Sequence, residues 1–366
     1  MESLGIVHCM DSMFWKNKRV FLTGHTGFKG SWLSLWLQSM GAIVRGYSLP
    51  VTNMPNLFSI ARVAEGMESY EGDIRNFDKL KQSLVDFEPE VVFHLAAQSL
   101  VRTSYESPVE TYDVNVMGLV HLLEAIRSLD ALKAVVIVTS DKCYDNKERQ
   151  SGYREDEALG GHDPYSSSKG CAELLTSSYR YSFFNSKEYK NHGCAIATGR
   201  AGNVIGGGDW ADDRLVPDLL RALEQGQRVR IRNPNSIRPW QHVLEPLGGY
   251  LQLAECLFLK GNEFASAWNF GPDKSDERPV QWIVETMLDM WGDNRGWSHD
   301  VENHPHEANN LNLDCSKAKL ELAWSPKQNI KDALSSTIDW HKAWLTGDDM
   351  RKITMLDIDR YIKKIV

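Results

Sequence analysis

Three glycines that follow a short apolar run constrain the fold of this chain more than any other feature. They are Gly24, Gly27 and Gly30, and the apolar residues 20–22 precede them. Apolar residues then recur at helical spacing from position 32 to position 40. A strand, a tight glycine turn and a helix form the context in which a glycine pattern binds phosphate. The stretch predicts a nucleotide site, although a plain strand–helix turn uses similar glycines.

The alternation of strand and helix patterns continues after this turn. Near-continuous apolar runs predict parallel strands over residues 42–47, 90–97, 133–138 and 195–198. Helical patterns cover 110–129 and a stretch that opens at Asp163 and Pro164, which suit the N-cap and the first helical position. This order predicts an α/β fold with a Rossmann-type, doubly wound parallel sheet.

The alternation weakens after residue 200, and we expect a smaller C-terminal substrate domain of mixed α/β structure there. We expect an N-terminal extension without fixed structure over 1–12 and a nucleotide-binding domain over 13–200, to which 236–262 returns. The substrate domain is then expected over 201–235 and 263–345, followed by a C-terminal tail over 346–366.

Composition and charge exclude several classes of protein. The net charge is −8 with no basic block to offset it, which argues against a nucleic-acid partner. No apolar run reaches transmembrane length, and residues 1–12 lack the basic and apolar regions of a signal peptide. The six cysteines are scattered without a C-x-x-C pair, as expected for reduced thiols in a cytoplasm.

Two polar groups are candidates for chemistry. The strand expected over 133–138 runs into Thr-Ser-Asp-Lys at 139–142, at the ligand end of the sheet. A strand-end turn with solvated charges is the alternative. Tyr165 and Lys169 are four residues apart on an expected helix, so they face the same side. A cation beside a phenol lowers the pKa of the phenol, which makes Tyr165 a candidate general base.

Other positions leave alternatives open. Tyr47 and Ser48 stand where dinucleotide folds usually carry an acidic residue for the adenosine ribose, so the choice between NAD and NADP stays open. Asp73 either accepts from an adenine amino group or caps the helix that starts near Asp78. Asn115 lies inside an expected helix, where Asn is a poor helix former, and either bonds locally or serves the site.

Two further groups concern a diphosphate and a metal. Five arginines gather by sequence in this acidic chain, and such a set suits either a diphosphate or a solvated face. They are Arg214, Arg228, Arg230, Arg232 and Arg238. The stretch His-Pro-His-Glu at 304–307 suggests a metal, but the proline and the lack of a third ligand at a convincing spacing argue against it, so no metal is predicted.

These motifs together resemble the extended short-chain dehydrogenase/reductases that act on nucleotide sugars. The motifs are the three glycines, Leu95-Ala96-Ala97, Tyr165-x-x-x-Lys169 and Arg200-x-x-Asn203. The resemblance runs from about residue 14 to about residue 344. Within the family, residues 24–30, 139–144, 203–210 and 238–243 are most similar to 4,6-dehydratases that act on CDP-glucose. Other 4,6-dehydratases usually carry Glu in place of Lys142, and Gly199 stands here in place of a bulkier residue.

The resemblance implies a tightly bound NAD and a set of contact residues. The implied cofactor contacts are Gly24, Thr26, Gly27, Phe28, Gly30, Asp73, Ile74, Leu95, Ala96, Ala97, Tyr165 and Lys169. The implied substrate contacts are Asn203, Arg214, Arg232, Arg238, His242 and His306. The implied catalytic residues are Tyr165, Lys169, Ser140, Asp141 and Lys142.

The resemblance also implies the reaction: oxidation of the sugar at C4, loss of water across C5 and C6, and return of the hydride to C6. Tyr165 would take the 4-hydroxyl proton, Ser140 would hold the 4-oxygen, and Asp141 would protonate the leaving 6-hydroxyl. Lys142 would take the C5 proton, which requires a neutral amine, or would stay charged and stabilise the enolate.

The expected product is CDP-4-keto-6-deoxyglucose, a precursor of deoxy sugars for surface polysaccharide such as the O-antigen of lipopolysaccharide. The family implies a homodimer or homotetramer that uses two helices per subunit, and no membrane partner. Three alternatives stay open: a 4,6-dehydratase for another nucleotide sugar, a nucleotide-sugar 4-epimerase, and a catalytically silent NAD-binding regulatory protein. The intact Tyr165, Lys169, Asp141 and Lys142 count against the last.

Overall fold

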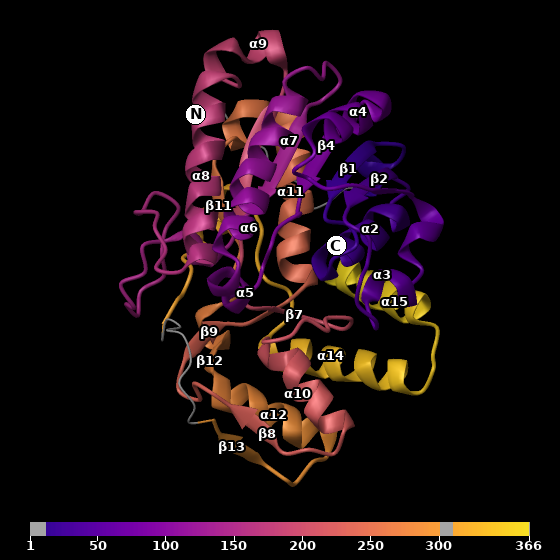
Figure 1. The fold of residues 1–366 in the computed structure, drawn as a ribbon, viewed down its shortest axis with the longest axis vertical. Coiled ribbons are helices and arrows are strands. Elements are labelled where there is room, and N and C mark those ends of the chain that lie inside the picture. The colour runs from indigo at the N-terminus through magenta and orange to yellow at the C-terminus, as the bar shows by residue number, and fades with distance from the viewer. Residues whose placement is uncertain (1–11, 301–309, 366) are drawn as a thin grey trace.

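A parallel sheet of seven strands forms the centre of the molecule, within residues 12–300 and 310–365, which the computed structural model describes (Figure 1). The extension expected over 1–12 lies almost wholly outside the described residues. The order across the sheet is β11-β6-β5-β4-β1-β2-β3, and neighbouring strands pair in parallel. The strands are β1 Arg19–Thr23, β2 Ile43–Ser48, β3 Glu68–Glu71, β4 Val91–His94, β5 Ala134–Val138, β6 Ala195–Arg200 and β11 Ala267–Asn269.

This order confirms the predicted Rossmann-type fold and places a ligand crevice. From β1 the chain runs to β2 and β3 on one side, and from β4 it continues on the other, so the order reverses between β1 and β4. Ligands of such sheets bind outside the carboxyl ends of the strands at this point of reversal. A binding site is therefore expected among the residues that follow β1, β4 and β5.

Helices cover both faces of the sheet because alternate strand residues point to opposite sides. On one face, Val20 and Leu22 join a core with α2 and α11; on the other, Phe21 joins a core with α4, α7 and α8. Trp32 and Trp36, on the predicted apolar stripe, are buried in the first core. The helices are α2 Phe28–Ser39, α4 Phe77–Phe87, α7 Gly118–Ile126, α8 Pro164–Ser182 and α11 Leu244–Lys260.

A smaller part with its own apolar core lies beyond the carboxyl ends of the sheet (Figure 1). Its strands pair two by two, β8 with β13 in parallel and β9 with β12 antiparallel. Its elements are α10 Leu215–Glu224, β8 Val229–Ile231, β9 Ile237–Pro239, β12 Glu277–Pro279, α12 Val280–Trp291, β13 Trp297–His299 and α14 Ile330–Leu345.

The chain passes between the two parts more than once. Helix α11 packs against β5 and β6, and β11 forms the edge of the main sheet, although β11 falls in the range expected for the substrate domain. Residues Met350–Ile365 form a helix, α15, which packs on α2 rather than trailing as a tail. We therefore propose the expected domain boundaries with two changes: 267–269 and 350–365 belong to the sheet part.

Apart from short 3-10 turns, the remaining described elements are also short. They are α1 Ser12–Trp15, α3 Leu57–Ile60, α5 Val101–Glu106, α6 Pro108–Tyr112, a π-helical turn Asp113–Met117, β7 Val204–Ile205, α9 Tyr189–His192, β10 Gln241–His242 and α13 Ser316–Glu321. Among the described residues, no helix combines the length and the apolar character needed to cross a membrane.

Candidate active site

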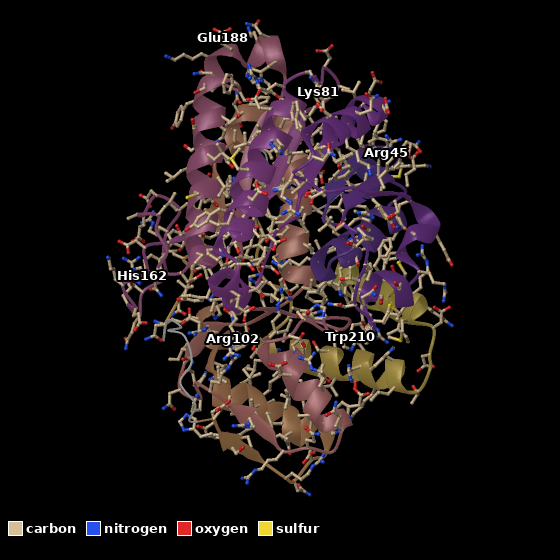
Figure 2. The ribbon with its side chains drawn as sticks, in the orientation of Figure 1. Arg45, Lys81, Arg102, His162, Glu188 and Trp210 are labelled. Carbon is tan, nitrogen blue, oxygen red and sulfur yellow. The ribbon has the colours of Figure 1, made fainter. Side chains whose placement is uncertain are left out.

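A cavity of about 1050 Å³ opens between the sheet and the smaller part. Its walls come from the residues after β1, β2, β4 and β5 on one side and from α10 and β8 on the other. Arg102 and Trp210, two of its lining residues, lie at the junction of the two parts (Figure 2). A space of this size accommodates a large ligand, or two ligands side by side.

The glycine turn forms a tight cradle at the start of α2. Gly24 has a left-handed backbone with φ of 76°, and a Cβ atom there would lie 2.6 Å from the Ala96 amide nitrogen. A Cβ atom at Gly30 would overlap the carbonyl oxygen of Gly24. Gly27, by contrast, is exposed to the cavity and caps α2 without a side chain. The first N–H groups of α2 thus stay open to an anion, which fits the diphosphate of a dinucleotide.

The end of β2 carries hydroxyls in place of an acidic residue. The Thr26 and Ser48 hydroxyl oxygens lie 2.7 Å apart, and both side chains line the cavity. Asp73 also lines it and forms a 2.6 Å ion pair with Arg75. Asp73 does not cap the next helix, because Asn76 is the N-cap of α4 and accepts from the Lys79 amide.

The segment after β4 is held in place by Asn115. Leu95, Ala96 and Ala97 line the cavity, and the chain then turns at Gln98. The Asn115 side chain accepts from the Gln98 amide at 2.8 Å and donates to the Gln98 carbonyl and to the Ser168 hydroxyl. Asn115 lies in the π-helical turn that interrupts the helix predicted over 110–129. Its side chain thus connects the β4 end to α8.

The end of β5 brings a hydroxyl, a carboxylate and an amine into the cavity. Ser140, Asp141 and Lys142 all line it. The Ser140 hydroxyl donates to Asp141 Oδ1 at 2.9 Å and accepts from the Lys142 amide. Asp141 is 1% exposed, and its Oδ2 has no hydrogen-bond partner among the described residues. The absent side chain of Gly202 leaves the space that the Asp141 carboxylate fills.

Tyr165 and Lys169 line the same cavity from the first turns of α8. Asp163 caps α8 by accepting from the Ser166 amide at 2.8 Å, as predicted. Burial raises the pKa of Tyr165 to about 12, although the Ser140 hydroxyl and the Arg214 charge oppose it. The expected lowering by the neighbouring lysine is therefore not found, because the loss of solvent dominates. Burial also lowers the pKa of Lys169 to about 8, and its ammonium donates to the Val138 carbonyl at 3.3 Å.

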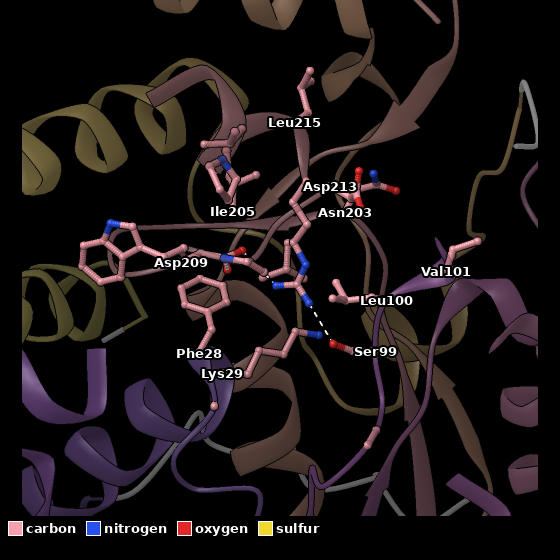
Figure 3. Close-up of a pocket in the computed structure, with 18 of the residues that line it drawn as sticks. Phe28, Lys29, Ser99, Leu100, Val101, Asn203, Ile205, Asp209, Asp213 and Leu215 are labelled. Carbon is pink, nitrogen blue, oxygen red and sulfur yellow. Dashed lines mark hydrogen bonds and ion pairs between the residues drawn. The ribbon is translucent and has the colours of Figure 1, made fainter. Parts of the chain in front are cut away.

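Arginines form the wall of the cavity on the side of the smaller part. All five arginines of the predicted cluster line the cavity. Arg214 pairs with Asp209 at 2.9 Å and donates to the Ser99 hydroxyl at 3.0 Å, beside Lys29 and Phe28 (Figure 3). Asn203, which also lines the cavity, has a left-handed backbone with φ of 46°.

One predicted substrate contact lies outside the cavity, and another lies outside the described residues. His242 is 2% exposed, does not line the cavity, packs against Trp32 and accepts from the Leu244 amide. Burial lowers the pKa of His242 to about 3, so it is a neutral core residue. His306, with the rest of the 304–307 stretch, lies outside the described residues. Within the described ranges, no group of three or more His, Cys, Asp or Glu side chains is arranged to hold a metal.

Several charged lining residues were not identified from the sequence. Arg102 pairs with Asp213 at 3.0 Å, which joins the sheet part to the smaller part across the cavity. Burial, followed by the charges of Arg214 and Lys169, lowers the pKa of Lys29 to about 7. Two sequence signals pointed to Lys29: its place in the 24–30 stretch and its position in the first turn of α2.

Comparisons with known proteins identify the family of this chain. The sequence model of the family described as GDP-mannose 4,6 dehydratase matches residues 21–266. A Salmonella typhimurium protein named CDP-glucose 4,6-dehydratase is 57% identical over 353 residues, covering 96% of this chain and 98% of the relative.

Solved structures share the fold at low identity. A dTDP-glucose 4,6-dehydratase from Bacillus anthracis, solved with NAD, has a TM-score of 0.73 at 22% identity and covers 89% of this chain and 96% of its own. A UDP-glucose 4-epimerase from Thermotoga maritima, solved with UDP-glucose, has a TM-score of 0.77 at 20% identity, covering 89% and 99%. The family match over most of the chain and the 57% identity over nearly all of it show that this chain belongs to the nucleotide-sugar 4,6-dehydratases of the GDP-mannose 4,6-dehydratase family.

Proposed function

We propose that this protein is a CDP-glucose 4,6-dehydratase, a lyase that converts CDP-glucose to CDP-4-keto-6-deoxyglucose and water. The observation that carries the proposal is that Asp141 and Lys142, at the end of β5, line the same cavity as Tyr165 and Lys169 on α8. An elimination pair and an oxidation pair thus face one space. The name of the Salmonella relative supports CDP as the nucleotide.

NAD is the proposed cofactor, and it supplies the acceptor for the C4 hydrogen and later returns that hydrogen to C6. The cradle of Gly24, Gly27 and Gly30 is the proposed holder of its diphosphate, with Thr26 and Phe28 beside it. Asp73 and Ile74 line the end of the cavity proposed for the adenosine. Leu95, Ala96 and Ala97 leave room along the β4 end.

The proposed oxidation uses Tyr165 as the base for the 4-hydroxyl proton. The phenol has to ionise for this role, and burial alone opposes that. The positive charge of Arg214 on the far wall favours the phenolate. A protonated Lys169, which lines the same cavity one helical turn from Tyr165, is proposed to favour it too. Ser140 is proposed to hold the 4-oxygen, and its hydroxyl already interacts with both Tyr165 and Asp141.

The proposed elimination uses the other pair. Once C4 is a ketone, the hydrogen on C5 is acidic, and Lys142 is the proposed group for removing it or for stabilising the enolate. Asp141 is the proposed acid for the departing 6-hydroxyl. Its buried Oδ2 has no partner among the described residues, which suits a group that donates its proton to a ligand.

The arginine wall is proposed to hold the nucleotide diphosphate. Arg214, Arg232 and Arg238 line the cavity opposite the sheet, and Asn203 lines it as well. Guanidinium groups match the oxygens of a diphosphate. His242 is not part of this proposed site because it is buried outside the cavity.

The assembly and cellular role are proposed from coarser support. Large apolar side chains are exposed on α6 and α8, including Val109 at 82%, Leu174 at 61% and Tyr181 at 76%, and a second copy of the chain is the proposed occupant of this face. The described cysteines are free thiols, which suits a cytoplasmic enzyme. Its product is a precursor of deoxy sugars for surface polysaccharide.

A substrate panel tests the proposal. The purified protein is incubated with NAD and, separately, with CDP-, UDP-, dTDP- and GDP-linked hexoses, and the products are identified by mass spectrometry and NMR. We expect a 4-keto-6-deoxy product from CDP-glucose in clear preference to the others. An epimerised sugar, or turnover of another nucleotide sugar only, would replace the proposal with one of its alternatives.

A further inference from the structure

A buried carboxylate lies directly behind the catalytic residues. Glu173 is on α8, four residues after Lys169, and is 2% exposed. Thr139 donates to its Oε1 at 2.5 Å, and Thr198 donates to its Oε2 at 2.8 Å. Arg200 donates to Oε2 at 2.8 Å and forms an ion pair with it. Glu173 does not line the cavity, so the proposed chemistry does not use it.

These bonds connect three parts of the chain. Glu173 belongs to α8, Thr139 follows β5, and Thr198 and Arg200 belong to β6. Arg200 also donates to the Tyr144 hydroxyl at 2.7 Å and to the Glu155 carbonyl at 3.1 Å, in the segment between β5 and α8. Although burial opposes ionisation of Glu173, the charge and hydrogen bond of Arg200 and the two threonine hydroxyls hold its pKa below the usual value.

The network joins the two halves of the proposed site. Thr139 directly precedes Ser140 and Asp141, which are assigned to the elimination. Lys169, assigned to the oxidation, is one helical turn before Glu173 and donates to the Val138 carbonyl. Helix α8 therefore binds the end of β5 at two successive residues: the Lys169 ammonium bonds the Val138 carbonyl, and the Glu173 carboxylate bonds the Thr139 hydroxyl.

The charge of Glu173 also compensates the positive charge of Lys169. Three other titratable groups interact with the Lys169 ammonium. Lys29 from α2 carries a positive charge when protonated, and His94 from β4 would carry one if it were protonated. The third is the Cys143 thiol, on the segment after β5. Burial lowers the pKa of Lys169 to about 8, and the charge of Glu173 opposes that effect.

We propose that Glu173 is a positioning residue that fixes the end of β5 against α8, so that Asp141 and Tyr165 act on one sugar in one alignment. This inference rests on the proposed dehydratase function. A displacement of about 1 Å at a reacting group can cost about 100-fold in rate, so one hydrogen bond at the base of Ser140–Asp141 carries a measurable effect.

A matched pair of substitutions tests the proposal. Thr139→Val and Thr198→Val each remove one hydroxyl that donates to Glu173 and keep the side-chain shape, but only Thr139 holds the strand end that carries Asp141. We expect Thr139→Val to lower kcat by about 10-fold or more with little change in KM, and Thr198→Val to stay within about threefold. Equal kcat values in the two variants would overturn the proposal, and melting temperatures report any shared loss of stability.

The charge of Glu173 is tested by Glu173→Gln through the pH profile. Without the carboxylate charge, the pKa of Lys169 falls further below 8, so Lys169 loses its proton at a lower pH. We expect the alkaline limb of single-turnover C4 oxidation to move to lower pH by about one unit. An unmoved limb in a folded variant would overturn this part.

Where Glu173→Gln does not fold, the threonine pair decides alone. Wild type serves as the control for the function itself. If wild type makes no 4-keto-6-deoxy product, the proposed function fails. If wild type makes the product and the two threonine variants have equal kcat values, only the positioning role of Glu173 fails.

Discussion

Replacing Gly202 with alanine tests the role of Asp141 without changing Asp141 itself. A Cβ atom at position 202 would overlap Oδ2 and Cγ of Asp141 and would lie 2.5 Å from Oδ1, whereas ordinary van der Waals contact begins at 3.4 Å. Because Asp141 is buried at the strand end, its carboxylate has to withdraw by about 1 Å. A misplacement of that size can cost about 100-fold in rate, so we expect Gly202→Ala to lower kcat by about that factor.

The loss should fall on the elimination, because Asp141 is not needed to oxidise C4. Rapid mixing with CDP-glucose should therefore show near-ultraviolet absorbance of the reduced cofactor at close to the wild-type rate, with slow release of the 4-keto-6-deoxy product. Gly248→Ala is the matched control, since its Cβ atom would lie in ordinary contact, 3.4 Å from Trp36 and Tyr361, away from the cavity. Wild-type turnover in Gly202→Ala, or the same loss in both variants, would refute the reasoning.

Four further predictions follow from the same geometry. Tyr165→Phe keeps the ring but removes the proton acceptor, and we expect kcat to fall by about 10²–10⁴-fold; a fall of only a few fold would remove Tyr165 from the mechanism. Gly27→Val places a branched side chain at the open cradle, where its Cβ meets only the Gly24 oxygen at 3.4 Å, so calorimetry should show weakened NAD binding with an unchanged melting curve. Lys142→Met should keep C4 oxidation but slow exchange of the C5 hydrogen with deuterated solvent, and loss of oxidation instead would assign Lys142 to binding. Burial raises the pKa of Glu245 to about 7, so its stabilising contribution is complete below about pH 4.5 and is lost as the pH rises towards 7. This loss of stability is worth about 3 kcal/mol, and Glu245→Gln should remove it. The melting temperature of the variant, measured relative to that of wild type, should therefore rise by about 4 °C between pH 5 and pH 8. A difference in melting temperature that stays the same at both pH values would contradict this prediction.

Local pattern predicted the fold well because the determining residues are close in sequence. The turn at Gly24, the strand before it and the helix after it are set by residues within about 20 positions of one another. The Asp163 cap and the facing of Tyr165 and Lys169 are also local. A helix start and a four-residue spacing need no knowledge of the rest of the chain.

What sequence could not predict depends on contacts between distant residues. The pKa of Tyr165 rises because elements from elsewhere in the chain bury it, and the sequence shows only its neighbour Lys169. His242 falls in a motif that resembles the family, yet Trp32 from α2 covers it. The docking of α15 on α2 likewise joins segments that are about 300 residues apart.

The unexpected glycine at position 199 has a physical explanation in the structure. A Cβ atom there would lie 2.7 Å from Cε1 of Tyr250, whose ring comes from α11 and packs edge-on against Phe270. The tyrosine ring thus occupies the space of the bulkier residue expected at this strand. Gly199 still accepts from the Thr139 amide at 2.9 Å, so the strand end is filled rather than loosened.

The fate of the C4 hydrogen distinguishes a 4,6-dehydratase from an epimerase and from a reductase. CDP-glucose carrying deuterium at C4 is incubated with the purified enzyme, a catalytic amount of NAD and no reductant, and the product is examined by NMR and mass spectrometry. We expect many turnovers to a 4-keto-6-deoxy sugar with the deuterium on C6. Deuterium that returns to C4 in an epimerised sugar, or a reaction that stops without added reductant, would contradict it.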